Sequence, residues 1–116
     1  MTAFLRPTEG SHPGLTRLEV VSSMHERKAR MAELADGFLV LPGALGTLDE
    51  AFEMAAWRQL GLHAKPVGVL DVLGFYRSLF EFLDHAADEG FLHPANRDIL
   101  LVDTNPGRLL DQMGLG

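Results

Sequence analysis

Cysteine is absent from this chain of 116 residues, and tryptophan and tyrosine occur once each. Without cysteine there is no disulfide framework, and both thiol catalysis and cysteine-containing zinc sites are excluded. The absence of disulfides fits a reducing compartment, so we expect a cytoplasmic location. A single domain of this length can bury a stable core without metals or disulfides.

Long apolar runs and a surplus of basic residues are also missing. Residues 1–7 lack the apolar centre of a signal peptide, and no segment approaches the roughly 20 apolar residues of a membrane span. Ten basic residues stand against 16 acidic ones, which gives a formal net charge of −6. Nucleic acids and anionic membranes need clustered Lys and Arg, so we expect neither as a partner. A small nucleotide is the favoured ligand.

Short apolar segments alternate with helical patterns from residue 15 onward. The expected strands are 18–21, 38–41, 66–72 and 99–102, and the expected helices are 24–35, 47–60, 75–89 and 106–113, with a turn or single helical turn at 93–97. This alternation predicts an α/β fold with a Rossmann-like parallel sheet of about four strands and flanking helices. Residues 1–14 are polar and show no periodicity, so we expect an irregular arm before one domain of residues 15–116.

Residues 38–50 (FLVLPGALGTLDE) are typical of a buried strand that runs into a glycine turn and then a helix. Gly43 and Gly46 would let the backbone approach a phosphate, and Thr47 would add a hydroxyl group. Thr47 and Glu50 also have the spacing of a capping box, with Thr47 as the N-cap. Tight turns use glycines and a Thr cap without any ligand, so this stretch alone supports a phosphate site and a purely structural turn equally.

Glu50 lies on one stripe of the expected helix with Met54 and Trp57, which would turn its carboxylate toward a cleft with apolar walls. A carboxylate repels a phosphate, so a site with both favours a carboxylate that faces developing positive charge, such as a ribosyl oxocarbenium ion. Arg27 falls among apolar residues on the helix 24–35. The open alternatives are a capping role for Glu50 and a surface ion pair for Arg27.

Three ordered motifs are more specific than the glycine turn alone. They are residues 23–31 (SMHERKARM), 41–50 (LPGALGTLDE) and 57–68 (WRQLGLHAKPVG). Together they resemble the LOG family of cytokinin riboside 5′-monophosphate phosphoribohydrolases, many of whose members carry the label lysine decarboxylase. The resemblance covers residues 12–113, and the motifs occur at natural spacing.

The resemblance implies a Rossmann-like fold, usually dimeric, that hydrolyses the N-glycosidic bond of AMP or a cytokinin riboside monophosphate. The products would be the free base and ribose 5-phosphate, and no cofactor would be needed. Arg27 and Glu50 match the catalytic pair of the family. The remaining matched positions would bind the phosphate and the nucleotide: Gly43, Ala44, Gly46, Thr47, Met24 and Lys28.

The decarboxylase label conflicts with the chemistry of this sequence. A pyridoxal enzyme needs a Schiff-base lysine in a much larger cofactor site, and this chain contains only Lys28 and Lys65. Lys28 belongs to the helix motif, and Lys65 precedes a proline in a connection. The histidines are scattered without the spacing of metal ligands, so we expect neither a cofactor nor a metal.

Two features of the chain depart from the family pattern. Ala44 stands where the family motif Pro-Gly-Gly-x-Gly-Thr has its second glycine, and a methyl group there would cost about 1 kcal/mol if the position needs a positive φ. Family members also begin with additional strand and helix units, so this chain resembles their C-terminal part. The alternative interpretation is a catalytically impaired nucleotide- or phosphate-binding or self-associating remnant of the same fold, with residues 57–66 suited to a dimer surface.

Overall fold

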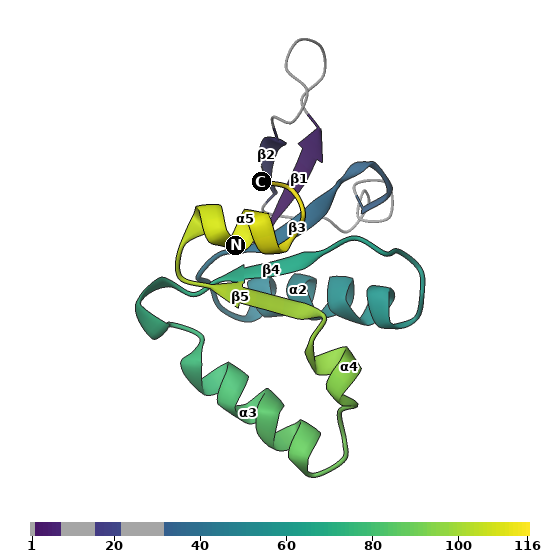
Figure 1. The fold of residues 1–116 in the computed structure, drawn as a ribbon, viewed down its shortest axis with the longest axis vertical. Coiled ribbons are helices and arrows are strands. Elements are labelled where there is room, and N and C mark those ends of the chain that lie inside the picture. Colours follow the sequence, from purple (N-terminus) through teal and green to yellow (C-terminus); the bar gives the residue numbers. More distant parts are fainter. Residues whose placement is uncertain (1, 8–15, 22–31) are drawn as a thin grey trace.

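The computed structural model describes residues 2–7, 16–21 and 32–116 (Figure 1). One five-stranded sheet has the order β2-β1-β3-β4-β5. Its strands are β1 (Thr2–Pro7), β2 (Thr16–Val21), β3 (Gly37–Val40), β4 (Val67–Leu70) and β5 (Leu100–Asp103). Because β3, β4 and β5 are parallel and carry flanking helices, the expected α/β, Rossmann-like class is confirmed.

The helices alternate with the parallel strands as expected. They are α2 (Leu45–Gln59), the 3₁₀ turn η1 (Val72–Gly74), α3 (Arg77–Asp88), α4 (Pro94–Arg97) and α5 (Pro106–Gln112). Gly61 and Gly90 have φ values of +78° and +84° just beyond α2 and α3, the conformation in which glycine ends a helix. The side chain of Asn105 caps α5. Of the expected helix 24–35, residues 32–34 are helical and the earlier part lies outside the described residues.

The N-terminal segment corrects one expectation. Thr2–Pro7 forms β1, which pairs antiparallel with both β2 and β3, so an irregular arm is wrong for these residues and the whole sheet is mixed. Residues 8–14 of that expected arm lie outside the described part of the chain. The six residues of β1 lack an alternating pattern, and their strand conformation depends on partners far away in the sequence.

The register of β1 determines where its two neighbours end. Thr2 lies opposite Val21 on one side and opposite Val40 on the other, so the carboxyl ends of β2 and β3 lie at the same edge of the sheet. Neighbouring strands are about 4.8 Å apart, which places the last residues of β2 and β3 about 10 Å apart. In the sequence, the predicted site residues follow these two strand ends, with Met24, Arg27 and Lys28 after β2 and residues 43–50 after β3.

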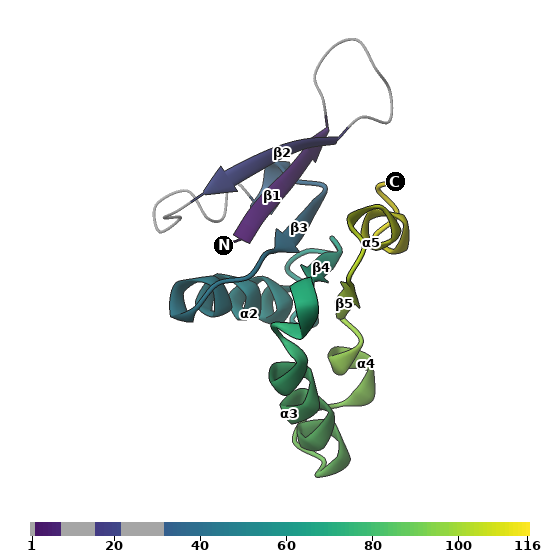
Figure 2. The same ribbon diagram turned by 90° about the vertical axis from the view of Figure 1, so that its left-hand side faces the viewer.

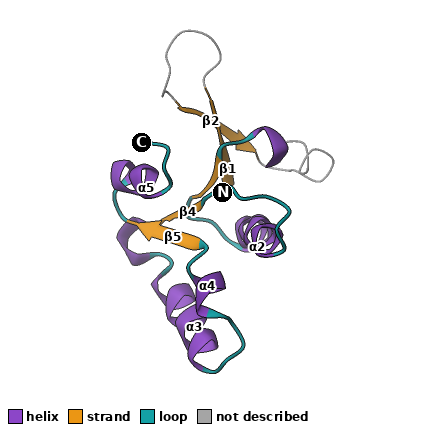
Figure 3. Ribbon diagram, turned by 45° about the vertical axis from the view of Figure 1, so that its right-hand side comes forward, coloured by secondary structure: helices purple, strands orange, loops and turns teal. Residues whose placement is uncertain are grey.

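Helices cover both faces of the parallel strands. Helices α2 and α3 lie on one face and α5 on the other (Figure 2). Helix α3 packs beside α4 on the β5 side of the sheet (Figure 3). Among the described residues, none of the helices has the length and apolarity needed to cross a membrane.

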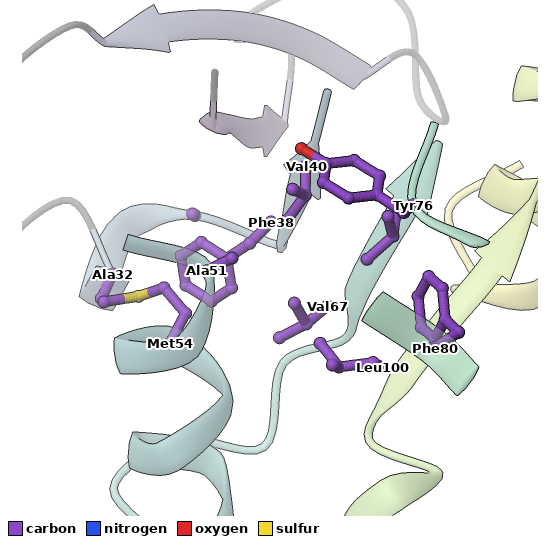
Figure 4. Packing of buried hydrophobic residues seen from close by; sticks show 11 residues of the cluster. Ala32, Phe38, Val40, Ala51, Met54, Val67, Tyr76, Phe80 and Leu100 are labelled. Atoms are coloured by element: carbon purple, nitrogen blue, oxygen red, sulfur yellow. The ribbon is translucent and has the colours of Figure 1, made fainter. Parts of the chain in front are cut away.

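The sheet has a hydrophobic core on each face, and the side chains of each strand alternate between these two faces. Phe38, Val40 and Val67 are buried on the face covered by α2 and α3 (Figure 4). Leu39 and its neighbours on β4 and β5 face α5 instead, as the period of two residues requires. A Cβ atom at Gly68 would overlap Met113 and lie 3.1 Å from Leu109 Cδ1, so glycine is what lets α5 approach β4 closely.

Leu73 has the only positive φ of a non-glycine residue in the described part of the chain, at φ +53° and ψ 30°, and its side chain is 98% exposed. The left-handed conformation costs an L-residue about 1–2 kcal/mol, and this side chain has little packing to lose. We expect Leu73→Gly to raise the free energy of unfolding by up to about 1 kcal/mol, after the extra chain entropy of glycine is subtracted. Urea unfolding measures this change.

The control is Leu73→Ala, which removes the same exposed side chain but keeps the Cβ atom that causes the strain. It should leave the free energy of unfolding close to that of the unchanged chain. Equal effects of the two substitutions would contradict a strain at this position.

Candidate functional site

The glycine turn joins β3 to α2 at the carboxyl end of the parallel strands. Helix α2 begins at Leu45, and its N-cap is Ala44, which forms no side-chain capping hydrogen bond. The first helical hydrogen bond runs from the N–H of Leu48 to the carbonyl of Ala44, at 3.0 Å. The expected capping box is therefore wrong, because Thr47 is the third residue of the helix and not its N-cap. The helix therefore begins at Leu45, two residues before the start at Thr47 that the Thr-x-x-Glu spacing indicated.

The start of α2 presents a small and open surface. Ala44, Leu45 and Gly46 are exposed, and a Cβ atom at Gly46 would meet no other atom within 4 Å. Ala44 has a φ of −120° and a ψ of −137°, so the position does not require a positive φ and the cost considered for its methyl group on that ground does not arise. The first N–H groups of a helix have no acceptor within that helix and lie at its positive end, which suits an anion.

Glu50 lies farther along α2 and is half-buried. On the same stripe, Met54 is fully buried and Trp57 packs against the core, so the expected stripe is confirmed. Glu50 thus lies between the exposed Asp49 and the buried Ala51, at the border of the apolar core. The other predicted site residues, Met24, Arg27 and Lys28, lie outside the described residues, and their roles stay predictions.

Tyr76 also contributes to this region, although none of the sequence motifs includes it. Its hydroxyl group donates a hydrogen bond to the carbonyl of Leu41 at 2.6 Å. Burial raises the pKa of Tyr76, and a hydrogen bond from the backbone N–H of Gly43 only partly offsets this effect. The phenol therefore stays protonated at neutral pH and remains a donor. A hydroxyl contact across the fold leaves no periodic signal in a sequence.

Side-chain hydrogen bonds hold the carboxyl end of α2 and the segment that follows it. His63 Nε2 donates to the carbonyl of Met54 at 2.8 Å, and its Nδ1 accepts the N–H of Lys65 at 3.0 Å. The ammonium group of Lys65 donates to the carbonyls of Ala32 and Glu33. Lys65 thus holds the helical residues 32–34 in place, which agrees with the argument against a Schiff-base lysine.

A cavity of about 620 Å³ lies at this closed end of α2, with Trp57, Leu62 and Lys65 among its lining residues. It is far along the helix from the glycine turn. In residues 2–7, 16–21 and 32–116, no group of three or more His, Asp or Glu side chains could hold a metal ion.

Residues 1–113 match the model of a protein family described as "Possible lysine decarboxylase". The chain belongs to this family. Its relatives include the cytokinin riboside 5′-monophosphate phosphoribohydrolase LOG7 of Arabidopsis thaliana, 46% identical over 109 residues that make up 94% of this chain and 50% of that protein. A cytokinin riboside 5′-monophosphate phosphoribohydrolase from Rhodococcoides fascians is 49% identical over 100 residues, which make up 86% of this chain and 50% of that protein.

A third relative is the "Probable cytokinin riboside 5′-monophosphate phosphoribohydrolase LOGL2" of Oryza sativa subsp. japonica, 45% identical over 109 residues, 94% of this chain and 45% of that protein. These names confirm the resemblance to the LOG family. The chain spans about half the length of the curated relatives it matches.

The hydrogen bonds of His63 predict a pH dependence of stability. Burial lowers the pKa of His63, and the positive charges of Arg58 and Lys65 lower it further. Between this lowered pKa and the unfolded value of about 6.5, the unfolded chain binds more protons than the folded one. The contribution of His63 to stability is therefore complete above about pH 6.5 and is lost as the pH falls through its folded pKa.

Urea unfolding of the unchanged chain and of His63→Gln, at a series of pH values from 5 to 8, measures this contribution. The difference in the free energy of unfolding between the two proteins should be larger at pH 8 than at pH 5, because glutamine does not titrate. A difference in the free energy of unfolding that stays constant or grows toward low pH would contradict a lowered pKa of His63 in the folded chain.

Proposed function

We propose that this chain is a nucleoside 5′-monophosphate phosphoribohydrolase that releases the free base from AMP or a cytokinin riboside monophosphate and leaves ribose 5-phosphate. The main supporting observation is the register of β1, since Thr2 lies opposite both Val21 and Val40. The two segments of the predicted site thereby start about 10 Å apart at one edge of the sheet. The names of the relatives support the reaction.

The phosphate would bind at the start of α2. Gly43, Ala44 and Gly46 provide small, accessible backbone, and Thr47 adds a hydroxyl group in the first turn. Backbone N–H groups and the helix dipole attract an anion locally, which suits a chain whose net charge is −6. The motif 23–31 would complete the nucleotide site with Met24 and Lys28.

Glu50 would lie beside the ribose. It follows Gly46 by four residues, about 6 Å along the helix axis, so a phosphate at the first turn leaves the sugar within reach of its carboxylate. In the reaction, a water oxygen bonds to C1′, the bond from C1′ to the base nitrogen breaks, and its electron pair and a proton from the water go to the base. Glu50 would stabilise the positive charge on the sugar and orient the water, while Arg27 would hold the nucleotide. This hydrolysis needs no cofactor.

The proposal includes a homodimer or higher homo-oligomer in the cytoplasm. The segment 57–66 would contribute to the contact between copies, because Leu60 and Leu62 are 71% and 67% exposed there. A second copy would cover this apolar surface, and a chain without cysteine fits a reducing compartment.

A second candidate is a nucleotide- or phosphate-binding, or self-associating, remnant of the same fold that no longer catalyses. The exposure of Leu60 and Leu62, at 71% and 67%, supports the self-associating form. Such a remnant would keep the anion site at α2 and lack turnover.

Substitution of Glu50 separates the two candidates. We expect Glu50→Gln to lower kcat for base release from AMP or N6-isopentenyladenosine monophosphate by about 10²–10⁴-fold, because the amide cannot offset positive charge on the sugar. Chromatography of the released base measures this rate. Asp49→Asn is the matched control, since it removes one negative charge from the exposed neighbouring position and should keep turnover. Absence of turnover in the unchanged, folded chain would favour the second candidate.

Gly46→Ala tests the phosphate site separately from catalysis. The new methyl group meets no protein atom, so stability should stay constant or rise by up to about 1 kcal/mol, as for glycine-to-alanine changes in helices. The same methyl group would occupy the space of a phosphate and weaken AMP binding about tenfold or more, a loss of about 1.4 kcal/mol. Calorimetric titration and thermal unfolding measure the two effects.

The matched control for Gly46→Ala is Gly107→Ala. Gly107 occupies the same second position of its helix, α5, where no phosphate is proposed. It should leave AMP binding unchanged. Equal binding by both variants and the unchanged chain would contradict the proposed phosphate site.

A further inference from the structure

Tyr76 connects the core to the glycine turn. It immediately precedes α3, and only 3% of its surface is exposed. Its ring lies in the core with Val40 and Val69, and its hydroxyl oxygen is directed toward the Val40 end of β3 (Figure 4). A buried hydroxyl group is costly without partners, and in this position the partners are backbone groups of the glycine turn.

One hydrogen bond joins the Tyr76 hydroxyl group to the residue before Pro42. The hydroxyl group donates to the carbonyl of Leu41 at 2.6 Å. Pro42 itself has no N–H and lies beyond the last residue of β3, so the sheet ladder does not continue through it. The Tyr76 hydroxyl group thus holds the carbonyl that precedes Pro42, at the start of the turn.

Hydrogen bonds also hold the backbone of Tyr76 in place. Its N–H donates to Asp71 Oδ1 at 2.8 Å, and the N–H of Asp71 donates to the carbonyl of Asp103 at 3.0 Å. Asp71 follows β4 and Asp103 is the last residue of β5. The hydrogen bonds therefore run from the end of β5, through the end of β4, to the turn after β3.

We propose that Tyr76 is a positioning residue for the anion site: its hydroxyl group holds the Leu41 carbonyl so that the start of α2 faces the phosphate. This inference rests on the proposed function for the identity of the ligand. Phenylalanine would fill the same space in the core without this hydrogen bond. The contribution of the hydroxyl group is therefore concentrated in the turn, and Tyr76 touches no reacting atom.

The test is Tyr76→Phe, with amide hydrogen exchange followed by NMR. We expect the exchange rate of the Gly43 amide to rise about tenfold or more beyond any change in the amides of β4 and β5, because the turn opens more often once the Leu41 carbonyl loses its donor. The dissociation constant for AMP should rise about tenfold, and kcat should change less than KM, since the phosphate does not react.

Leu109→Val is the matched control. It removes one methylene group from the core on the opposite face of the sheet, so it should change stability without a specific effect on the turn. Asp71→Ala is a second variant, which removes the acceptor for the Tyr76 N–H and should raise exchange at Gly43 to a smaller extent.

The outcomes separate this inference from the proposed function. If exchange at Gly43 rises no more in Tyr76→Phe than in Leu109→Val, the positioning role is wrong, whatever the chain binds. If exchange rises and the affinity for AMP is unchanged, the role in anion binding is wrong. If the unchanged chain binds no AMP, the proposed function and the link to phosphate both fail, and the exchange experiment still shows whether Tyr76 holds the turn.

Discussion

The pairing of β1 with two neighbours determines the layout of the predicted site. Because Thr2 lies opposite both Val21 and Val40, β2 and β3 end at the same edge of the sheet. The segments that follow them contain Arg27 and Glu50, the proposed catalytic pair. A slip of β1 by one residue against either partner would shift one of the two segments along the sheet by about 3.3 Å. The backbone hydrogen bonds of a six-residue strand thus control the relative position of the two strand ends that precede these motifs in the sequence.

The two ends of α2 differ in how their polar groups are satisfied. At the carboxyl end, His63 and Lys65 bond to backbone carbonyls, and Arg58 donates to the carbonyl of Lys65 at 2.6 Å. At the amino end, an alanine N-cap offers no side-chain acceptor, and the space in front of Gly46 is open. Side-chain hydrogen bonds hold the carboxyl end of the helix against neighbouring segments, while the amino end would suit an external anion.

Charge and burial together favour a small anionic ligand over a polymer. A chain with a net charge of −6 has no overall attraction for phosphates, so binding must depend on local groups. The helix end, the turn next to Tyr76 and the predicted basic residues Arg27 and Lys28 would provide such groups. The half-buried Glu50 adds a negative charge at a distance along α2, where a ribose and not the phosphate would lie.

The sequence by itself determined the α/β class, the order of helices and strands after residue 15, and the family. Those features depend on local periodicity, on glycines such as Gly61 and Gly90 after helices, and on motifs with a defined spacing. It also identified the glycine turn and the stripe of Glu50, Met54 and Trp57, because these follow from the period of a single helix.

Only the tertiary structure decided the rest. Thr2–Pro7 became a strand because β2 and β3 accept its hydrogen bonds, although its own residues carry no alternating pattern. Helix α2 starts at Leu45 and not at Thr47, since the direction in which the chain leaves β3 overrides the Thr-x-x-Glu spacing. The hydroxyl group of Tyr76 reaches Leu41 across 35 residues of sequence. Local patterns report on neighbours within a turn or a strand, whereas such contacts exist only once distant segments have packed together.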